Sequence, residues 1–240
     1  MRRSFHLLAA AGLLSLFALA AVAQMPASAG AQNAEALTAA YNQAMQTKDW
    51  AAAVAAAEQL VSLKATSQNL SLLGSAQLYS GSADTALATY DRALAASEQE
   101  KPADRQAQGK WKDDLSKILI GRGNALLKLK RTTEAIDEYN RAAGYASNAG
   151  QAYFNLCAVL YNMGNTKDSP AACRKCVQAD PTKANAWFVL GSVLFADAPI
   201  DNGKVKGSAE MREALEKYLA LAPEGPHAAD TKAMLDMIAK

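Results

Sequence analysis

The stretch that decides the fold reads Leu119-Ile-Gly-Arg-Gly-Asn-Ala-Leu126 and continues with Ala135-x3-Tyr139-x2-Ala142. The pattern returns about 34 residues later as Tyr153-x2-Leu156-Cys157-x2-Leu160, followed by Ser169-x3-Cys173-x2-Cys176 and Asp180-Pro181. A third copy opens with Trp187-x2-Leu190-Gly191-x2-Leu194. This period is typical of helix–turn–helix repeats, so the stretch predicts a series of antiparallel helix pairs.

The small residues of the pattern predict where the two helices of each pair cross. Two helices approach closely only where small side chains face each other, and the pair Gly123 and Ala135 supplies such a contact. Cys157 and Ser169 repeat it at the same offset, and Tyr139 follows Ala135 by one turn on the same face. The remaining apolar face of each pair can be buried only by the next pair, so stacking is expected. An ordinary helical bundle would need this spacing to recur by chance and is the less favoured alternative.

These motifs resemble the tetratricopeptide repeat family, whose pattern is Trp-x2-Leu-Gly-x2-Tyr, then Ala-x3-Phe, then Pro. The resemblance implies an all-α, right-handed α-solenoid of about five repeats. We expect these repeats at residues 35–66, 67–99, 116–149, 150–183 and 184–223, with insertions at 97–114 and 196–208. In residues 226–239 apolar side chains recur every three or four positions, which predicts a C-terminal helix that caps the stack.

The irregular segments carry their own expectations. Mixed charges in residues 97–114 predict a solvated helix extension and a connecting loop, from which Trp111 packs back against the stack. Pro170 suits the first turn of a helix, so the second helix of the fourth pair is expected to begin up to a turn late. Residues 198–203 predict a loop, after which the helical pattern resumes at Glu210.

Residues 1–23 have the composition of a secretory signal peptide. Arg2 and Arg3 precede an apolar run from Leu7 to Ala23, and Ala21-Val-Ala23 is a small-x-small cleavage site. An uncleaved membrane anchor is the alternative, although the apolar run is short for a span. Cleavage before Gln24 predicts an exported protein, periplasmic or secreted, whose residues 24–34 form a disordered linker.

The charge balance indicates no nucleic-acid partner. The formal net charge of the 240 residues is +2, and removal of the signal segment with its two arginines and no acidic residue leaves about zero. No later segment is apolar enough to predict stable insertion into a membrane.

Few residues could carry catalysis. His227 is the only histidine outside the signal segment, and it follows Pro226 at a helix start where we expect it to be exposed. Gly121-Arg-Gly-Asn124 lies inside a helical repeat with no preceding strand, so it does not predict a nucleotide site. No nucleophile elbow is recognisable. We therefore expect neither enzyme activity nor a cofactor.

Two interpretations of the three cysteines stay open. Cys157 and Cys173 face each other across one helix pair, and in an oxidising compartment they are the predicted partners if a disulfide forms. Alternatively, all three cysteines are buried thiols that fill positions for small residues. Cys173 and Cys176 have C-x-x-C spacing, but a zinc site lacks a fourth ligand nearby, so no metal is expected.

The resemblance also implies where a partner binds. In the family, the first helix of each pair lines the concave surface, and ligands are usually peptides laid along it. Asparagine amides there offer a donor and an acceptor to an extended peptide backbone, beside aromatic anchors. The corresponding partner-binding residues are Lys117, Asn124, Lys128, Phe154, Asn155, Tyr161, Asn162, Asn185 and Phe188, with Ile120, Gln151, Ala158 and Ser192 also facing inward. The alternatives are a merely solvated helix face, with Phe154 and Phe188 packed between adjacent pairs.

The family members that bind chaperone tails hold a terminal carboxylate with a clamp of lysine, asparagine and arginine side chains. Asn124 and Asn155 match two of the clamp positions, but Ile120, Asn185 and Val189 replace its basic residues, so the clamp is absent. The favoured hypothesis is a non-catalytic scaffold that binds a peptide or protein in the concave groove. The alternative is an accessory redox or metal-binding module that uses Cys157, Cys173 and Cys176.

Overall fold

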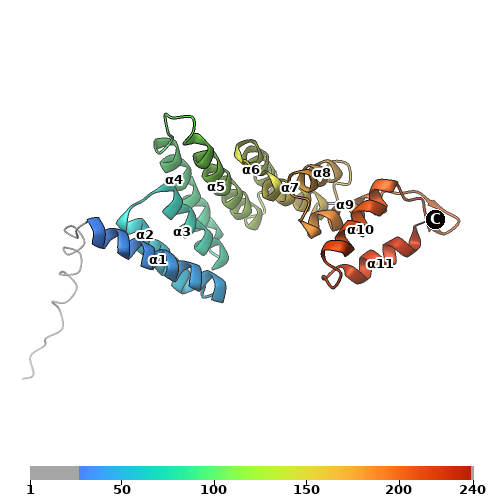
Figure 1. Cartoon of the computed structure of the whole chain (residues 1–240), viewed down its shortest axis with the longest axis horizontal. Helices are drawn as coiled ribbons and strands as arrows, with labels where there is room; N and C mark the ends of the chain where they lie inside the picture. Colours follow the sequence, from blue (N-terminus) through green and yellow to red (C-terminus); the bar gives the residue numbers. More distant parts are fainter. Residues whose placement is uncertain (1–26, 239–240) are drawn as a thin grey trace, which may run out of the picture.

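The computed structural model describes residues 27–238, and within this range the chain forms eleven helices and one short β-hairpin. The helices follow one another along an elongated body, with α1 near one end and α10 and α11 at the other (Figure 1). The elements are α1 (Ala27–Thr47), α2 (Trp50–Leu63), α3 (Ser67–Tyr79), α4 (Ala83–Gln99), α5 (Gln108–Lys128), α6 (Thr132–Tyr145), α7 (Gly150–Asn162), α8 (Ser169–Ala179), α9 (Ala184–Ala196), β1 (Ile200–Asp201), β2 (Lys204–Val205), α10 (Ala209–Leu221) and α11 (Ala228–Met237).

Consecutive helices pack in pairs, and each pair packs against the next. The pairs are α1 with α2, α3 with α4, α5 with α6, α7 with α8 and α9 with α10, and α11 then packs on α10. The predicted all-α stack of about five repeats with a C-terminal capping helix is thus confirmed. No helix of the described range is both long enough and apolar enough to cross a bilayer.

The N-terminal boundary differs from the expectation. Helix α1 begins at Ala27, so most of the segment 24–34 that we expected to be disordered is helical. Alanine has the highest intrinsic helix propensity, and Ala27, Ala29, Ala31 and Ala34 extend the helix that the later apolar pattern begins. The predicted signal peptide and its cleavage site lie outside the described residues.

One turn geometry ends the first helix in four of the pairs. A residue with positive φ follows the helix, and the next amide donates to the carbonyl five positions earlier, as in Arg131 N to Leu126 O at 2.9 Å. This is the Schellman arrangement, which satisfies carbonyls at a helix end. The residues with positive φ are Lys48, Gly81, Lys130 and Gly164.

The glycines at the helix crossings make room for a tyrosine ring. We expected Gly123 to face Ala135; the side chain that lies nearest to the glycine is the ring of Tyr139, one turn further along α6. A Cβ atom on Gly123 would lie 2.6 Å from Cε1 of Tyr139, and one on Gly74 would lie 3.0 Å from the ring of Tyr90. The missing side chain on one helix is therefore matched by a large, buried ring on the other.

Tyr90 also joins its own pair to the next one. Its ring lies where a Cβ atom on Gly121 of α5 would be, and its hydroxyl is 2.9 Å from Ser75 Oγ on α3. The side chain is 1% exposed. One tyrosine thus packs against the first helices of two successive pairs.

These buried tyrosines predict loss of stability at alkaline pH. Burial raises the pKa of Tyr90 from 10.0 to about 12, and it also raises the pKa of Tyr41 and Tyr139. Because the folded state holds these protons more tightly than the unfolded state, their contribution is complete below pH 10 and is lost as pH rises toward 12. We expect the melting temperature to fall across this window, together with the rise of tyrosinate absorbance. Titration near pH 10 with the helices intact would contradict the burial described here.

The first insertion has the helix extension and the connecting loop that its charges predict. Helix α4 extends to Gln99 and α5 begins at Gln108, so much of 97–114 is helical. Trp111 packs against the stack as predicted: its Nε1 donates to the carbonyl of Ser97 at 2.8 Å, and its ring meets Tyr145 edge-on. Helix α8 begins at Ser169, at the position equivalent to Ala135 of α6, which confirms the predicted late start.

The second insertion contains the β-hairpin where a plain loop was expected. Asn202 and Gly203 both have positive φ, which gives the two-residue turn that matches the twist of paired strands. Val205 of β2 then forms a bridge with Ile238 and is buried with Met211 and Leu215. The hairpin and Ile238, which directly follows α11, therefore pack together against α10.

Candidate functional site

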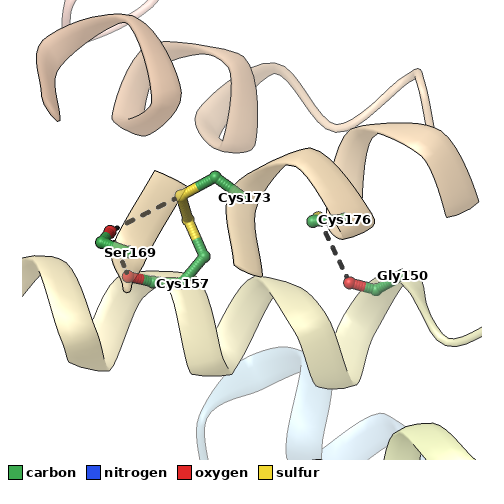
Figure 2. Close-up of a disulfide and its surroundings, with 5 residues drawn as sticks. All are labelled: Gly150, Cys157, Ser169, Cys173 and Cys176. Carbon is green, nitrogen blue, oxygen red and sulfur yellow. Dashed lines mark hydrogen bonds between the residues drawn. A yellow bond between two sulfur atoms is a disulfide. The ribbon is translucent and has the colours of Figure 1, made fainter. Parts of the chain in front are cut away.

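The fourth helix pair is fastened by a disulfide between Cys157 of α7 and Cys173 of α8, whose Cα atoms are 4.9 Å apart (Figure 2). The predicted pairing is confirmed, and the alternative of three buried thiols is wrong. The two cysteines are separated by 16 positions, as are Gly74 from Tyr90 and Gly123 from Tyr139. The disulfide therefore occupies the helix crossing that a tyrosine ring over glycine fills in the two preceding pairs.

Cys176 remains a thiol and lies in the interior. Its Sγ donates to the carbonyl of Gly150 at 3.3 Å, on the same pair of helices (Figure 2). Burial raises the pKa of the Cys176 thiol to about 11. The thiolate that exchange or metal binding requires is scarce at neutral pH for such a group. Between residues 27 and 238, no cluster of histidine, cysteine and acidic side chains has the arrangement of a metal site.

Three clefts follow one another along the first helices of the middle pairs, and we call the surface of α3, α5 and α7 that carries them the inner face. Two clefts lie between α3 and α5, which contact each other directly. The first is lined by Gln68, Ser71, Leu72, Asp114, Lys117 and Ile118. The second is lined by Leu78, Tyr79, Asn124, Leu127 and Lys128. The third lies between α5 and α7 and is lined by Asp113, Ser116, Lys117, Ile120, Ala146, Ser147, Asn148 and Gln151.

A row of hydrogen-bonded amides crosses from α5 to α7 on this face. Gln151 Nε2 donates to Asn155 Oδ1 at 2.8 Å, and Asn155 Nδ2 donates to Asn124 Oδ1 at 3.3 Å. The same oxygen of Asn124 accepts from the hydroxyl of Tyr139 at 2.8 Å. We call Gln151, Asn155 and Asn124 the amide row. The structure thus brings two of the predicted asparagines together, and links them to the tyrosine at the helix crossing.

The link to Tyr139 predicts a stability cost that the sequence did not indicate. Replacing Asn124 with alanine leaves a buried phenol hydroxyl without its acceptor, so we expect unfolding to become easier by about 1–2 kcal/mol. Adding Tyr139→Phe to the same chain removes the orphaned hydroxyl and is expected to recover part of that loss. Urea denaturation of the two single variants and the double variant measures the coupling. Strictly additive losses would show that the bond does not matter.

The charges beside the clefts are mostly paired. Asp114 holds both Lys110 and Lys117, the latter at 3.0 Å. Asp113 accepts from the amide and the hydroxyl of Ser147, and these bonds lower the pKa of its carboxyl. Lys128 is different: it makes no ion pair or hydrogen bond with any side chain in residues 27–238.

The other predicted partner-binding residues lie apart from the amide row. Tyr161, Asn162 and Asn185 are exposed, and none is hydrogen-bonded to the row within the described chain. Phe154 is half-buried beneath the ammonium of Lys183, which is 5.9 Å from the ring centroid. Ala158, next to Cys157, offers no polar group.

Phe188 is occupied by the C-terminal segment. Its ring stacks on His227 with 3.9 Å between centroids and packs obliquely on Tyr218. The expected exposure of His227 is therefore wrong, because Phe188 covers one face of the imidazole and leaves the side chain half-buried. Phe188 therefore packs between neighbouring elements, which was the alternative to a place in the peptide groove.

Tyr79 is the inner-face residue that sequence reasoning missed. Its side chain is 60% exposed, and its ring stacks on Trp50 at 5.3 Å. The signal was present: Tyr79 follows Gly74 by the same interval that separates Lys128 from Gly123. Projecting the register of the third pair onto the second would have identified it, as well as Gln68 and Ser71.

Comparison with known proteins agrees with the fold described above. Residues 116–148 match the tetratricopeptide repeat family. The fold is similar to that of YrrB, "a TPR protein with an unusual peptide-binding site", at 17% identity over 80% of this chain and 88% of that one, with a TM-score of 0.53.

Two other structures are similar to the same degree. MamA aligns with a TM-score of 0.54 at 15% identity, over 81% of this chain and 94% of MamA. A tetratricopeptide repeat protein from Parabacteroides merdae aligns with a TM-score of 0.55 at 16% identity, over 86% of this chain and 75% of its own. No curated protein sequence matches. Residues 116–148 thus match the tetratricopeptide repeat family, and the chain has the fold of tetratricopeptide repeat proteins.

Proposed function

We propose that this protein is an exported, non-catalytic scaffold that binds an extended peptide segment of a partner protein across the inner face. The observation that carries the proposal is the amide row, which is flanked by clefts on successive helices. The oxygens of Asn124 and Asn155 both accept hydrogen bonds. Both N–H groups of Asn124 and the second N–H group of Asn155 have no hydrogen-bond partner among residues 27–238, so they are the donors that a ligand can use. Donors spaced along a groove suit the carbonyl groups of an extended chain.

Two further observations support this function over the redox or metal-binding alternative. The disulfide takes the place of a packing residue at a helix crossing, which is a structural role. The third cysteine is buried and its raised pKa disfavours the reactive thiolate. YrrB, which has a similar fold, is described by its peptide-binding site. Export rests on the signal-like residues 1–23 and agrees with a disulfide inside the protein.

The test compares two asparagines on opposite sides of the stack. Peptides are first selected on the protein from a displayed library of random sequences, and their affinity is then measured by fluorescence anisotropy. Asn155→Ala is expected to weaken binding about five- to tenfold, the effect of one lost hydrogen bond. The matched control is Asn140→Ala on α6, where the amide bonds only to its own helix and is exposed. Equal affinity for both variants would refute the proposed groove.

A further inference from the structure

The second cleft of the inner face concentrates apolar surface that is open to solvent. This cleft, which we call the Tyr79 cleft, has a volume of about 420 Å³ between the C-terminal ends of α3 and α5. Tyr79 and Leu127, which line it, are 60% and 37% exposed. The Tyr79 ring is held in place by its stacking on Trp50, so the apolar wall is a fixed surface. A cleft with a large apolar wall and a few polar groups offers a place where an apolar group of a ligand can pack.

The polar groups of the Tyr79 cleft are donors. Asn124 Oδ1 already accepts from Tyr139 and Asn155, so its amide orientation is fixed and its Nδ2 is the group left for a ligand. Lys128, one turn further along α5, adds an ammonium group with three N–H donors. A ligand that satisfies this cleft must therefore present acceptors next to an apolar group.

Charge decides which acceptor fits. The carboxylates that line the neighbouring clefts are satisfied within the chain: Asp114 by two lysines and Asp113 by Ser147. Lys128 is the one charged group lining these three clefts that has no partner among residues 27–238. The carbonyl ends of α3 and α5 oppose an anion here and together carry roughly one elementary charge, but solvent and salt screen this partial charge. The amides of Ser82 and Arg131 already donate to carbonyls at these ends, whereas the full charge of Lys128 has no partner among residues 27–238. The balance favours a carboxylate.

We propose, on the basis of the function proposed above, that the Tyr79 cleft selects peptides in which a large apolar side chain lies next to a carboxylate. The apolar side chain packs between Tyr79 and Leu127, Asn124 Nδ2 donates to the adjacent peptide carbonyl, and Lys128 pairs with the carboxylate. An Asp or Glu side chain and a free C-terminus offer the same group. Peptides with a free and with an amidated C-terminus distinguish these two sources.

The experiment uses random peptides of nine residues displayed on phage and selected on the protein. We expect the enriched sequences to carry an aromatic or aliphatic residue within two positions of Asp, Glu or the C-terminus. For an enriched peptide, Lys128→Glu should weaken binding at least about tenfold, and Lys128→Arg should retain most of the affinity. The matched control is Lys112→Glu, the same charge change on α5 at an exposed position that lines none of the three clefts. Replacing the acidic residue of the peptide with its amide should abolish the difference between wild type and Lys128→Glu.

The remaining outcomes separate this proposal from the one on which it rests. Enriched peptides that lose affinity with Asn155→Ala but not with Lys128→Glu would leave the groove in place and overturn the selectivity. Enrichment of basic or uncharged sequences would also overturn it. A lower melting temperature of Lys128→Glu with unchanged peptide affinity would mean that Lys128 only complements the helix end. Failure to enrich any peptide would count against both proposals.

Discussion

Replacing Tyr139 with alanine is expected to lower the free energy of unfolding by about 3–5 kcal/mol, the range for truncating a fully buried aromatic side chain. The Tyr139 side chain is 1% exposed, and its ring fills the space left by the absent side chain of Gly123. Truncation therefore opens a cavity at the crossing of α5 and α6, and it also removes the donor that holds Asn124. Urea denaturation followed by circular dichroism measures the loss.

Two variants make this result specific. Tyr139→Phe keeps the ring and removes only the hydroxyl, so we expect it to cost about 1 kcal/mol. Tyr161→Ala removes a tyrosine that is 39% exposed on α7, and it should have a much smaller effect than Tyr139→Ala. If the two alanine variants were equally stable, the Tyr139 ring would not be the packing element described here.

Removing the disulfide is the second change with a large expected effect. Cys157→Ala combined with Cys173→Ala is expected to lower stability by about 3 kcal/mol, because the bond closes a loop with a sequence separation of 16. The variant also leaves the α7–α8 crossing without the tyrosine that fills it in the preceding pairs. Reduction of the wild-type protein should reproduce the loss. Thermal and urea denaturation, with and without reductant, provide the measurement.

Cys176→Ala is the control for this experiment. It removes a buried thiol that is not part of the bond, so its stability should still fall on reduction. The wild-type protein, denatured without reductant, should contain one reactive thiol per chain, and the double variant should also contain one. Three reactive thiols in the wild type would rule out the disulfide.

The repeat period of the sequence predicts most of this fold, because the two helices of each repeat pack on each other through residues at the same positions. The first helix of each pair carries a small residue at the crossing, namely Gly74, Gly123 or Cys157. The residue that packs against it is Tyr90, Tyr139 or Cys173, which in each pair lies one turn after a small residue of the second helix. Residue type alone did not indicate which side chain lies nearest to Gly123: the sequence pointed to Ala135, and the space beside the glycine holds the Tyr139 ring. Glycine indicates the left-handed turn residue at Gly81 and Gly164. Lys48 and Lys130 adopt the same left-handed conformation, which their residue type does not predict and only their position in the repeat does.

The sequence could not predict contacts made by the segments that lie outside the repeat period. The insertion before α10 shifts that helix out of the period, so no register predicts that His227 stacks on Phe188. The β-hairpin, in contrast, could have been predicted from the sequence. Asn202-Gly203 is a dipeptide that favours a two-residue hairpin turn, and the residues on either side of it pair as β1 and β2. In the candidate site, the sequence predicted Asn124 and Asn155, but their shared hydrogen bond, the link to Tyr139 and the exposure of Tyr79 required coordinates.

The proposed function requires the inner face of α3, α5 and α7 to hold the peptide. Titrating a selected peptide into isotopically labelled protein and following side-chain amide signals by NMR tests it directly, because both faces carry such groups. We expect the signals of Asn124, Asn155 and Gln151 to shift, whereas those of Asn140 on α6 and Gln178 on α8 stay in place. Shifts confined to Asn140, Gln178 and the backbone of α4, α6 and α8 would contradict it.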